Sequence, residues 1–281
     1  MSAHDDGLSA RDFDRLRSFI QAEFGICLGA EKKTMLEGRL RRRLRELNLN
    51  SYRSYCEYLF AQSGQQEEKT RFIDVVTTNK TDFFREPRHF SSLTEALPEL
   101  TSRCGGRPLQ VWSAGCSSGE EPYTLAMVLS DYAEKHTGFR FRILATDIST
   151  RVLEKAELGV YTAEDVEPLP EALRRKYVMR SRDRASERVR VTPDLRKLVD
   201  FRRLNFMEDD YGLEQKSDAI FCRNVIIYFD RPTQARILRK LIHYLVLGGY
   251  LFVGHSETLH DMGLPLEPLG PALYRRTDGR A

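Results

Sequence analysis

From residue 109 onward, short apolar segments alternate with longer amphipathic ones, and this alternation constrains the fold more than any other feature. The apolar segments show no polar and apolar alternation, which is typical of strands buried on both faces of a parallel sheet. Right-handed crossover helices would cover both faces and give a doubly wound α/β fold. The predicted strands are LQVWSA, FRILATDI, SDAIFCRNVIIYF and GGYLFVG, and the predicted helices are EEPYTLAMVLSDYAEKH, TRVLEKAEL and PTQARILRKLIHYLV.

Residues 1–78 show no strand pattern and are predicted to form a small, all-helical domain. Apolar residues recur at helical spacing in DFDRLRSFIQAEFGI, for which Ser9 is the expected N-cap. The leucines of EKKTMLEGRLRRRLRELNL form one narrow stripe, and SYRSYCEYLF and EEKTRFIDVVTTN predict two further helices. Residues 79–108 would link this domain to the α/β domain at 109–281. Within the latter, at about 174–197, KYVMR and RVRVT flank a polar turn and predict an inserted antiparallel hairpin.

The net charge of +3 is too small to indicate a polyanionic partner, but the charge is unevenly distributed. From Lys32 to Arg45 there are seven Lys or Arg residues and a single acid, Glu37. These cations would form a positive surface opposite the leucines, and a solvated face without a partner is the alternative. The expected substrate-docking residues on this surface are Arg39, Arg42, Arg43 and Arg45.

The five cysteines are scattered, without the paired spacing of a disulfide framework or a zinc site, and we expect no metal. No apolar run reaches the length of a membrane span, and the N-terminus is polar and acidic where a signal peptide would be basic and then apolar. A cytoplasmic protein is therefore expected.

Small residues and then carboxylates follow the first predicted strand, in VWSAGCSSGEEPYTLAM. In a doubly wound sheet, ligands bind beyond the carboxyl ends of the strands. Ala114 and Gly115 would let a ligand approach the backbone, although a tight turn that simply needs glycine is the alternative. The spacing is not GxGxxG, and Glu120 and Glu121 would repel phosphates at a helix N-terminus. This position therefore favours a ligand with cationic or hydroxyl groups.

Asp147 ends the second predicted strand, in LATDIS. An acid there accepts hydrogen bonds from both hydroxyls of a ribose, unless it only complements a helix dipole. A ribose without a pyrophosphate, beside carboxylates that can meet an ammonium group, describes S-adenosylmethionine better than NAD. At the tip of FCRNVIIYF, Asn224 can bond the methionyl part and Tyr228 can border the methyl group, or both residues are structural. No N/D-P-P-Y/W tetrapeptide occurs, so a base nitrogen is not the expected acceptor.

The segments TTNKTDFFREPRHF, VWSAGCSSGEEPYTLAM, LATDIS and FCRNVIIYFD occur together in this order and spacing. In this the chain closely resembles the CheR family of bacterial chemotaxis receptor-glutamate methyltransferases, up to GYLFVGHSETL. The resemblance implies an all-helical N-terminal domain and a class I, Rossmann-like methyltransferase domain with an inserted β-subdomain. It also implies that S-adenosylmethionine methylates glutamates of the chemoreceptor cytoplasmic helical bundle, giving S-adenosylhomocysteine, for sensory adaptation.

The resemblance also implies roles for single residues. Arg85 is expected at the methionyl carboxylate of the cofactor, Glu121 at its ammonium group and Asp147 at its ribose. Tyr228 and Arg85 are the expected catalytic residues, beside the reacting atoms. The remaining cofactor-binding residues that it implies are Asn79 and Thr81 of the linker, Asn205 and Phe206 near the adenine, and Asn224 and Val225 near the methionyl part.

One departure from the family and two rival hypotheses remain. Some members bind a receptor C-terminal pentapeptide along a glycine-rich hairpin of the β-subdomain, by strand addition. Here the corresponding turn, RSRDRASER, has no glycine, so only its basic character favours an acidic receptor tail.

A nucleic-acid or small-molecule methyltransferase and a non-catalytic receptor-binding module are the rivals. The nearly neutral charge and the missing tetrapeptide weigh against the first, and the intact cofactor-side residues against the second. We expect a monomer that is recruited to membrane receptor arrays, without membrane insertion and without nucleic acid.

Overall fold

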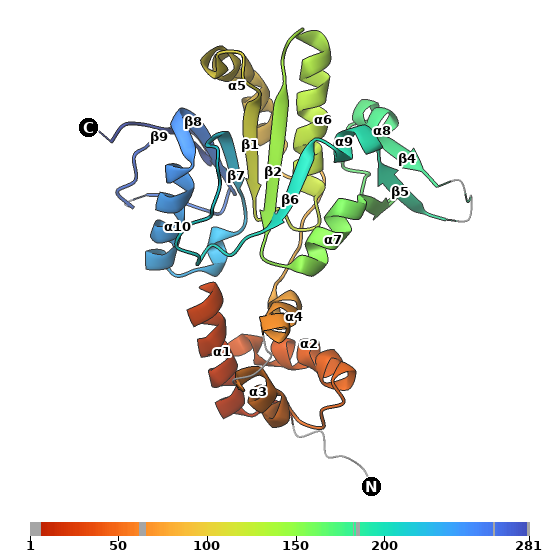
Figure 1. The fold of residues 1–281 in the computed structure, drawn as a ribbon, viewed down its shortest axis with the longest axis vertical. Coiled ribbons are helices and arrows are strands. Elements are labelled where there is room, and N and C mark those ends of the chain that lie inside the picture. The colour runs from red at the N-terminus through yellow and green to blue at the C-terminus, as the bar shows by residue number, and fades with distance from the viewer. Residues whose placement is uncertain (1–6, 62–65, 182, 184–185, 261, 280–281) are drawn as a thin grey trace.

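The computed structural model describes residues 7–61, 66–181, 183, 186–260 and 262–279, and its helical N-terminal domain lies below the α/β domain in Figure 1. The helical domain contains α1 (Ala10–Phe24), the 3₁₀ helix η1 (Ala30–Lys32), α2 (Lys33–Glu46), α3 (Tyr52–Phe60) and α4 (Gln66–Val76). The Ser9 side chain accepts a hydrogen bond from the backbone N–H of Asp12, which confirms the predicted cap. Leu36, Leu40 and Leu44 are fully or nearly fully buried, so the predicted stripe is the core side of α2.

The α/β domain contains a seven-stranded sheet with the order β6-β2-β1-β7-β8-β10-β9. The pairs from β6 to β8 are parallel, whereas β10 is antiparallel to both β8 and β9. The mostly parallel, doubly wound sheet that the sequence predicts is therefore confirmed. The strands are β1 (Leu109–Ala114), β2 (Phe141–Asp147), β6 (Val199–Arg203), β7 (Ser217–Cys222), β8 (Leu245–Val253), β9 (Leu266–Gly270) and β10 (Leu273–Arg276).

Helices cover both faces of this sheet because alternate strand residues point to opposite sides. Leu109 and Val111 of β1 pack in one core with α5 (Arg88–Cys104) and α6 (Glu120–Lys135). Trp112 and Ala114 pack in the other with α10 (Arg231–His243), and α7 (Thr150–Leu158) contacts β2 and β6. The buried face of α5 packs in the core of the α/β domain. Most of the expected linker, 79–108, is therefore part of that domain.

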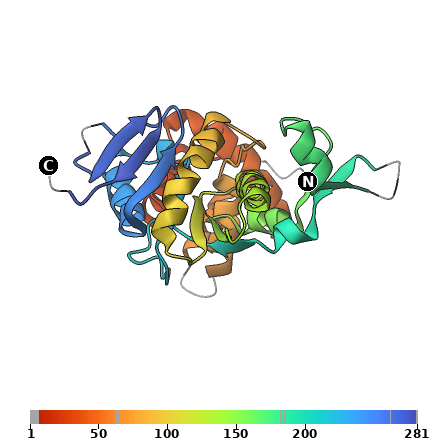
Figure 2. The ribbon, with the colours of Figure 1, turned by 90° about the horizontal axis from the view of Figure 1, so that it is seen from above.

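The inserted subdomain projects to one side of the molecule, opposite the C-terminus in Figure 2. Its antiparallel sheet has the order β3-β5-β4, formed by β3 (Val160–Thr162), β4 (Val178–Arg180) and β5 (Arg188–Val191). The short helices α8 (Glu171–Tyr177) and α9 (Pro193–Arg196) flank β4 and β5 in the sequence. The predicted hairpin is confirmed, while three residues of its glycine-free turn, 182, 184 and 185, lie outside the described part of the chain.

Several predicted boundaries were wrong, and one of them is the end of the helix expected over EEKTRFIDVVTTN, since α4 ends at Val76. The strand expected over SDAIFCRNVIIYF ends at Cys222, because Asn224 adopts a left-handed φ of 57° and the 3₁₀ helix η2 (Ile226–Tyr228) follows. The helix expected over PTQARILRKLIHYLV ends at His243, and its last two residues already belong to β8. The strands β3, β6, β9 and β10 were not predicted. Within the described segments, no helix is both long and apolar enough to cross a bilayer.

Candidate functional site

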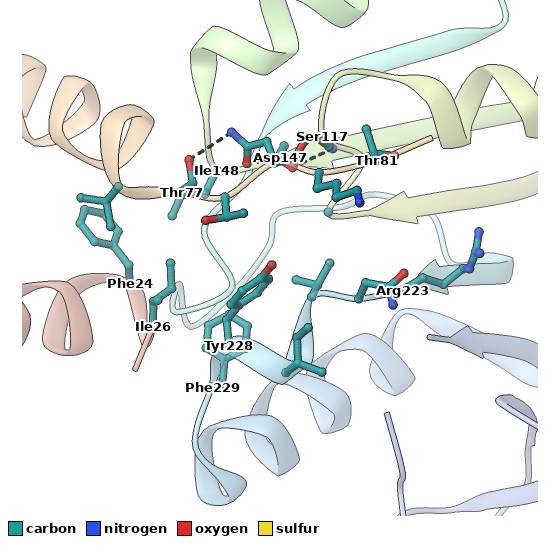
Figure 3. A pocket seen from close by; sticks show the side chains of 18 of the residues that line it. Phe24, Ile26, Thr77, Thr81, Ser117, Asp147, Ile148, Arg223, Tyr228 and Phe229 are labelled. Carbon is teal, nitrogen blue, oxygen red and sulfur yellow. Dashed lines mark hydrogen bonds between the residues drawn. The ribbon is translucent and has the colours of Figure 1, made fainter. Parts of the chain in front are cut away.

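A cavity of about 490 Å³ lies beyond the carboxyl ends of β1, β2, β6 and β7. The neighbours of β1 in the sheet are β2 on one side and β7 on the other, so strand order reverses there, where doubly wound sheets bind their ligands. The cavity wall includes Asp147, the last residue of β2, and residues that follow the other strands: Gly115 and Ser117 after β1, Asn205 after β6 and Asn224 after β7. Figure 3 shows part of this wall, with Phe24 and Ile26 approaching from the helical domain.

The helical domain closes the cavity through direct contacts with the strand tips. Its contribution to the wall includes Phe24, the segment 26–29 and residues 76–78, and the linker adds residues 79–82. Because both domains supply walls, the cavity exists only where they meet. The hydrogen bonds between the domains include those from Cys27 N to Tyr228 O (2.8 Å), from Asn205 Nδ2 to Glu23 O (2.9 Å) and from Thr150 Oγ1 to Asp74 Oδ2 (2.7 Å).

The glycine turn after β1 is required by close packing. Gly115 has a φ of 92°, and a Cβ atom there would lie 2.4 Å from Cγ2 of Val225. Ala114 does not line the cavity, since it is buried in the core beside Trp112, so the structure does not bring this expected residue to the site. Ser117 was expected only as one of the small residues of this turn, but its backbone N–H donates to Asp147 and its Oγ donates to the carbonyl of Asn79 at 3.0 Å.

Asp147 lies in the cavity wall as expected. Its Oδ2 accepts from Ser117 N at 2.8 Å and its Oδ1 from Ser149 N at 3.0 Å, which fixes the carboxylate. Burial raises the pKa of Asp147, while these backbone donors act in the opposite direction. Each carboxylate oxygen can accept a second hydrogen bond. A carboxylate fixed in this way in the cavity wall can accept further hydrogen bonds, as from the two hydroxyls of a ribose.

The two glutamates at the start of α6 have different surroundings. Glu120 is buried and accepts from Ser118 Oγ, at 2.9 Å through Oε1 and 2.8 Å through Oε2, and burial raises its pKa. Glu121 lines the cavity, where its Oε1 accepts from Ser113 Oγ at 2.7 Å and its Oε2 from Arg223 Nη1 at 3.0 Å. Only Glu121 is therefore placed to meet a cationic group of a ligand.

Arg223 connects two walls of the cavity, a role that sequence reasoning missed although the residue stands at a strand tip. Its side chain is 3% exposed and donates to Glu121 on one side and to Glu86 Oε2 on the other, at 3.0 Å from Nη2. It also donates to the carbonyl of Arg85. Phe84 and Glu86 both have left-handed φ angles, 57° and 55°, which are costly for residues other than glycine. Arg223 thus holds the strained segment that carries Arg85 into the cavity wall.

The remaining expected cofactor residues also lie in the cavity wall: Asn79, Thr81, Arg85, Asn205, Phe206, Asn224 and Val225. The Asn205 amide is used within the protein, since its Nδ2 donates to Glu23 O and its Oδ1 accepts from Met207 N at 3.0 Å. Phe206 supplies an apolar surface beside it. Tyr228 is 37% exposed and projects from the wall opposite Asp147 in Figure 3. It is therefore placed to contact both the cavity and a molecule outside it.

Among the residues that the structure describes, Glu86, His89 and His255 are close enough together to share a metal ion. Arg223 already donates to Glu86 Oε2, at 3.0 Å from Nη2. Burial and Arg223 lower the pKa of His89 to about 4. The expectation of a metal-free site stays a prediction.

The arginines of the basic helix α2 are of two kinds: some bond within the helical domain, and others are exposed and could contact a substrate. Arg39 donates to Thr77 O at 3.1 Å and to Val76 O, at the end of α4, and Arg43 donates to Glu68, which is 2% exposed. The side chain of Arg42 is 82% exposed, and Arg45 is also exposed. Of the four arginines expected to dock a substrate, Arg39 and Arg43 thus hold the domain together.

Carboxylates at the start of α6 and at the tip of β2, a seven-stranded sheet with an antiparallel β10, and a closing helical domain together define a methyltransferase that binds S-adenosylmethionine. Family models agree: "CheR methyltransferase, all-alpha domain" matches residues 11–77, and "CheR methyltransferase, SAM binding domain" matches residues 79–269. The chain belongs to the CheR methyltransferase family.

Curated relatives resemble this chain over nearly their whole length. The chemotaxis protein methyltransferase of Escherichia coli (strain K12) is 40% identical over 268 residues, which cover 95% of this chain and 91% of that protein. Chemotaxis protein methyltransferase 2 of Pseudomonas aeruginosa is 38% identical over 263 residues, covering 94% of this chain and 92% of that protein.

Proposed function

We propose that this protein transfers the methyl group of S-adenosylmethionine to glutamate side chains on the cytoplasmic helical bundle of chemoreceptors, giving glutamyl methyl esters and S-adenosylhomocysteine. The observation that carries the proposal is one cavity that joins Asp147 and Glu121 at the strand tips to a partly exposed Tyr228. The curated relatives are named chemotaxis protein methyltransferases, which supports a methyl transfer that serves chemotaxis.

The cavity wall offers a partner for each part of the cofactor. Asp147 would hold the ribose, Glu121 the ammonium group and Arg85 the methionyl carboxylate, with Phe206 beside the adenine. When bound, the cofactor supplies an activated methyl group on a sulfonium. The chain then needs to hold the acceptor in line with that methyl group and to exclude water.

A glutamate acceptor fits this site because its carboxylate is already ionised near pH 7, with a reference pKa of about 4.3. No general base is required, so catalysis comes from positioning, which supplies about 7 to 11 kcal/mol in well-oriented reactions. Besides meeting the methionyl carboxylate of the cofactor, Arg85 can attract the carboxylate of the acceptor glutamate. Tyr228 can border that acceptor carboxylate. Ile227, which is 46% exposed next to Tyr228, offers an apolar contact for the receptor helix that presents the glutamate.

Substrate docking would use the exposed cations of α2, Arg42 and Arg45, because the methylated face of a receptor bundle is rich in glutamate. The inserted sheet has β4 at its edge, where an acidic receptor tail could add as a further strand. A cytoplasmic location with recruitment to membrane receptor arrays is part of the proposal.

The test is the chemistry of the methylated product. A receptor cytoplasmic fragment is incubated with the protein and methyl-labelled cofactor, and the labelled product is treated with mild base. A carboxyl methyl ester should release the label as methanol, whereas methylated amines or ring nitrogens keep it. Base-stable label would eliminate glutamate as the acceptor.

A further inference from the structure

A buried carboxylate stands directly behind the cavity and belongs to none of the expected site residues. Glu257 follows β8 in the segment GHSETL and is 4% exposed. Its Oε1 accepts from the backbone N–H groups of Val225 at 2.8 Å and Ile227 at 3.4 Å. Its Oε2 accepts from the N–H groups of Asn224, at 2.9 Å, and Gly254. Four backbone donors therefore converge on one side chain.

Three of these donors belong to the loop that carries Asn224, Val225 and Tyr228 into the cavity wall. Asn224 has a left-handed φ of 57°, which a residue other than glycine adopts at a cost. Gly254 packs closely against Asn224, since a Cβ atom at Gly254 would lie 2.5 Å from Asn224 Nδ2 and 2.9 Å from Asn224 N. The segment after β8 thus fixes the loop through one carboxylate and one close backbone approach.

We propose that Glu257 is a positioning residue for methyl transfer, which holds the loop 224–228 so that Asn224 and Tyr228 face the cofactor and the acceptor. This inference depends on the proposed function in one respect only, namely that a receptor glutamate is the methyl acceptor. Cofactor affinity reports on the same loop without any acceptor, because Asn224 and Val225 line the cavity.

The use of both carboxylate oxygens makes the inference specific. Each oxygen accepts from two N–H groups, so an ionised carboxylate satisfies all four donors. In Glu257→Gln, the amide NH₂ would face two N–H donors in either orientation of the side chain. This isosteric change should therefore move the loop and leave the volume of the buried side chain unchanged.

The experiment compares Glu257→Gln with Asp218→Asn in the full chain. Asp218 is the control for a buried carboxylate away from the cavity, since it is 1% exposed and lies at the opposite end of β7. It accepts from the backbone N–H of Gln110 at 2.8 Å and from both terminal nitrogens of Arg107, at 2.7 and 2.6 Å. For each variant, calorimetry gives the dissociation constant for S-adenosylhomocysteine. Methylation of a receptor fragment gives kcat and the KM for the receptor, and thermal unfolding gives the folded fraction at the assay temperature.

We expect Glu257→Gln to lower kcat by about 10- to 100-fold, since a misplacement of about 1 Å costs on the order of 100-fold in rate. S-adenosylhomocysteine binding should weaken, and the KM for the receptor should change less than kcat, because Ile227 and Tyr228 of this loop are only part of the receptor contact and α2 supplies the rest. Asp218→Asn should keep the wild-type kcat and cofactor affinity while its unfolding temperature falls. A purely structural role would make the two variants alike.

The inference is overturned if folded Glu257→Gln keeps both kcat and cofactor affinity within about twofold of wild type, or if its losses match those of Asp218→Asn. If Glu257→Gln does not fold, Gly254→Ala tests whether the segment after β8 positions the loop 224–228. It presses on Asn224 from the same side, and an unchanged kcat there overturns the inference. If the wild-type protein methylates no receptor fragment, the proposed function fails, and the cofactor affinities of the variants still decide the role of Glu257.

Discussion

Arg42 and Arg43 are neighbours on α2, yet neutralising them should have very different effects on stability. The Arg43 side chain is 17% exposed, and its Nε lies 3.0 and 3.1 Å from the two carboxylate oxygens of Glu68, which is 2% exposed. Removing one partner of such a buried pair costs about 3–5 kcal/mol. Tyr55 still donates its hydroxyl to Glu68 at 2.9 Å, so we expect about 3 kcal/mol for Arg43→Met. Arg42 is 82% exposed and pairs with Glu46 in solvent, so Arg42→Met should cost less than about 1 kcal/mol.

Urea unfolding followed by two signals can assign the loss to the helical domain. Trp112 is the single tryptophan and is buried in β1, so its fluorescence reports on the α/β domain. Far-ultraviolet circular dichroism reports on helices throughout the chain. Arg43→Met should bring part of the dichroism change to lower urea, ahead of the fluorescence change. Replacing Glu68 by Met as well should restore much of the stability, because no unpaired buried charge remains. Equal stability losses in Arg42→Met and Arg43→Met would refute the reasoning.

Three further predictions concern ligand binding, docking and pH. Asp147→Ala should weaken S-adenosylhomocysteine binding at least about tenfold, since charged hydrogen bonds contribute about 1.5–3 kcal/mol each; an unchanged calorimetric dissociation constant would contradict the ribose assignment. Reversing Arg42 and Arg45 to Glu should raise the KM for a receptor fragment at low salt and flatten its salt dependence, whereas reversing Arg53, also exposed, should not. Wild-type efficiency in the double variant would exclude this docking surface. Burial lowers the pKa of His89 from 6.5 to about 4, so the stability that its neutral form provides is complete above about pH 6.5 and is lost as the pH falls toward 4, by up to about 1.4 kcal/mol per pH unit. His89→Phe should flatten that part of the urea-midpoint profile, and parallel profiles would show that another group is responsible.

The strand-tip residues could be placed from the sequence because parallel strands all end at one edge of the sheet. Gly115 and Asp147 each follow a recognisable strand, so their meeting in one cavity was predictable. Which of Glu120 and Glu121 faces that cavity was not predictable. Neighbouring residues on a helix point about 100° apart, and the docking of α6 on the sheet selects between them.

The residues that hold the site in place gave no local signal. Arg223 meets Glu86 and Glu257 meets the loop after β7 only through tertiary contacts, 137 and 30–33 residues apart in the sequence. The basic helix poses the same difficulty, because apolar periodicity shows which face enters the core and not which charged residues flank it. Arg39 and Arg43 lie at that flank, where α4 supplies Glu68 and the backbone carbonyls of Val75 and Val76.

The shared construction of the cavity has a consequence for protein engineering. Exchanging the helical domain between relatives to alter receptor choice is an obvious experiment, but the cut at residue 78 passes through the cavity wall. A chimera would combine the Ile26 to Gly29 and 76–78 segments of one parent with the Tyr228 loop of the other. Cys27 N must still reach Tyr228 O, and Asn205 must still reach the carbonyl of Glu23. Transplants should therefore retain cofactor binding only when the segments on both sides of this seam are exchanged as matched sets.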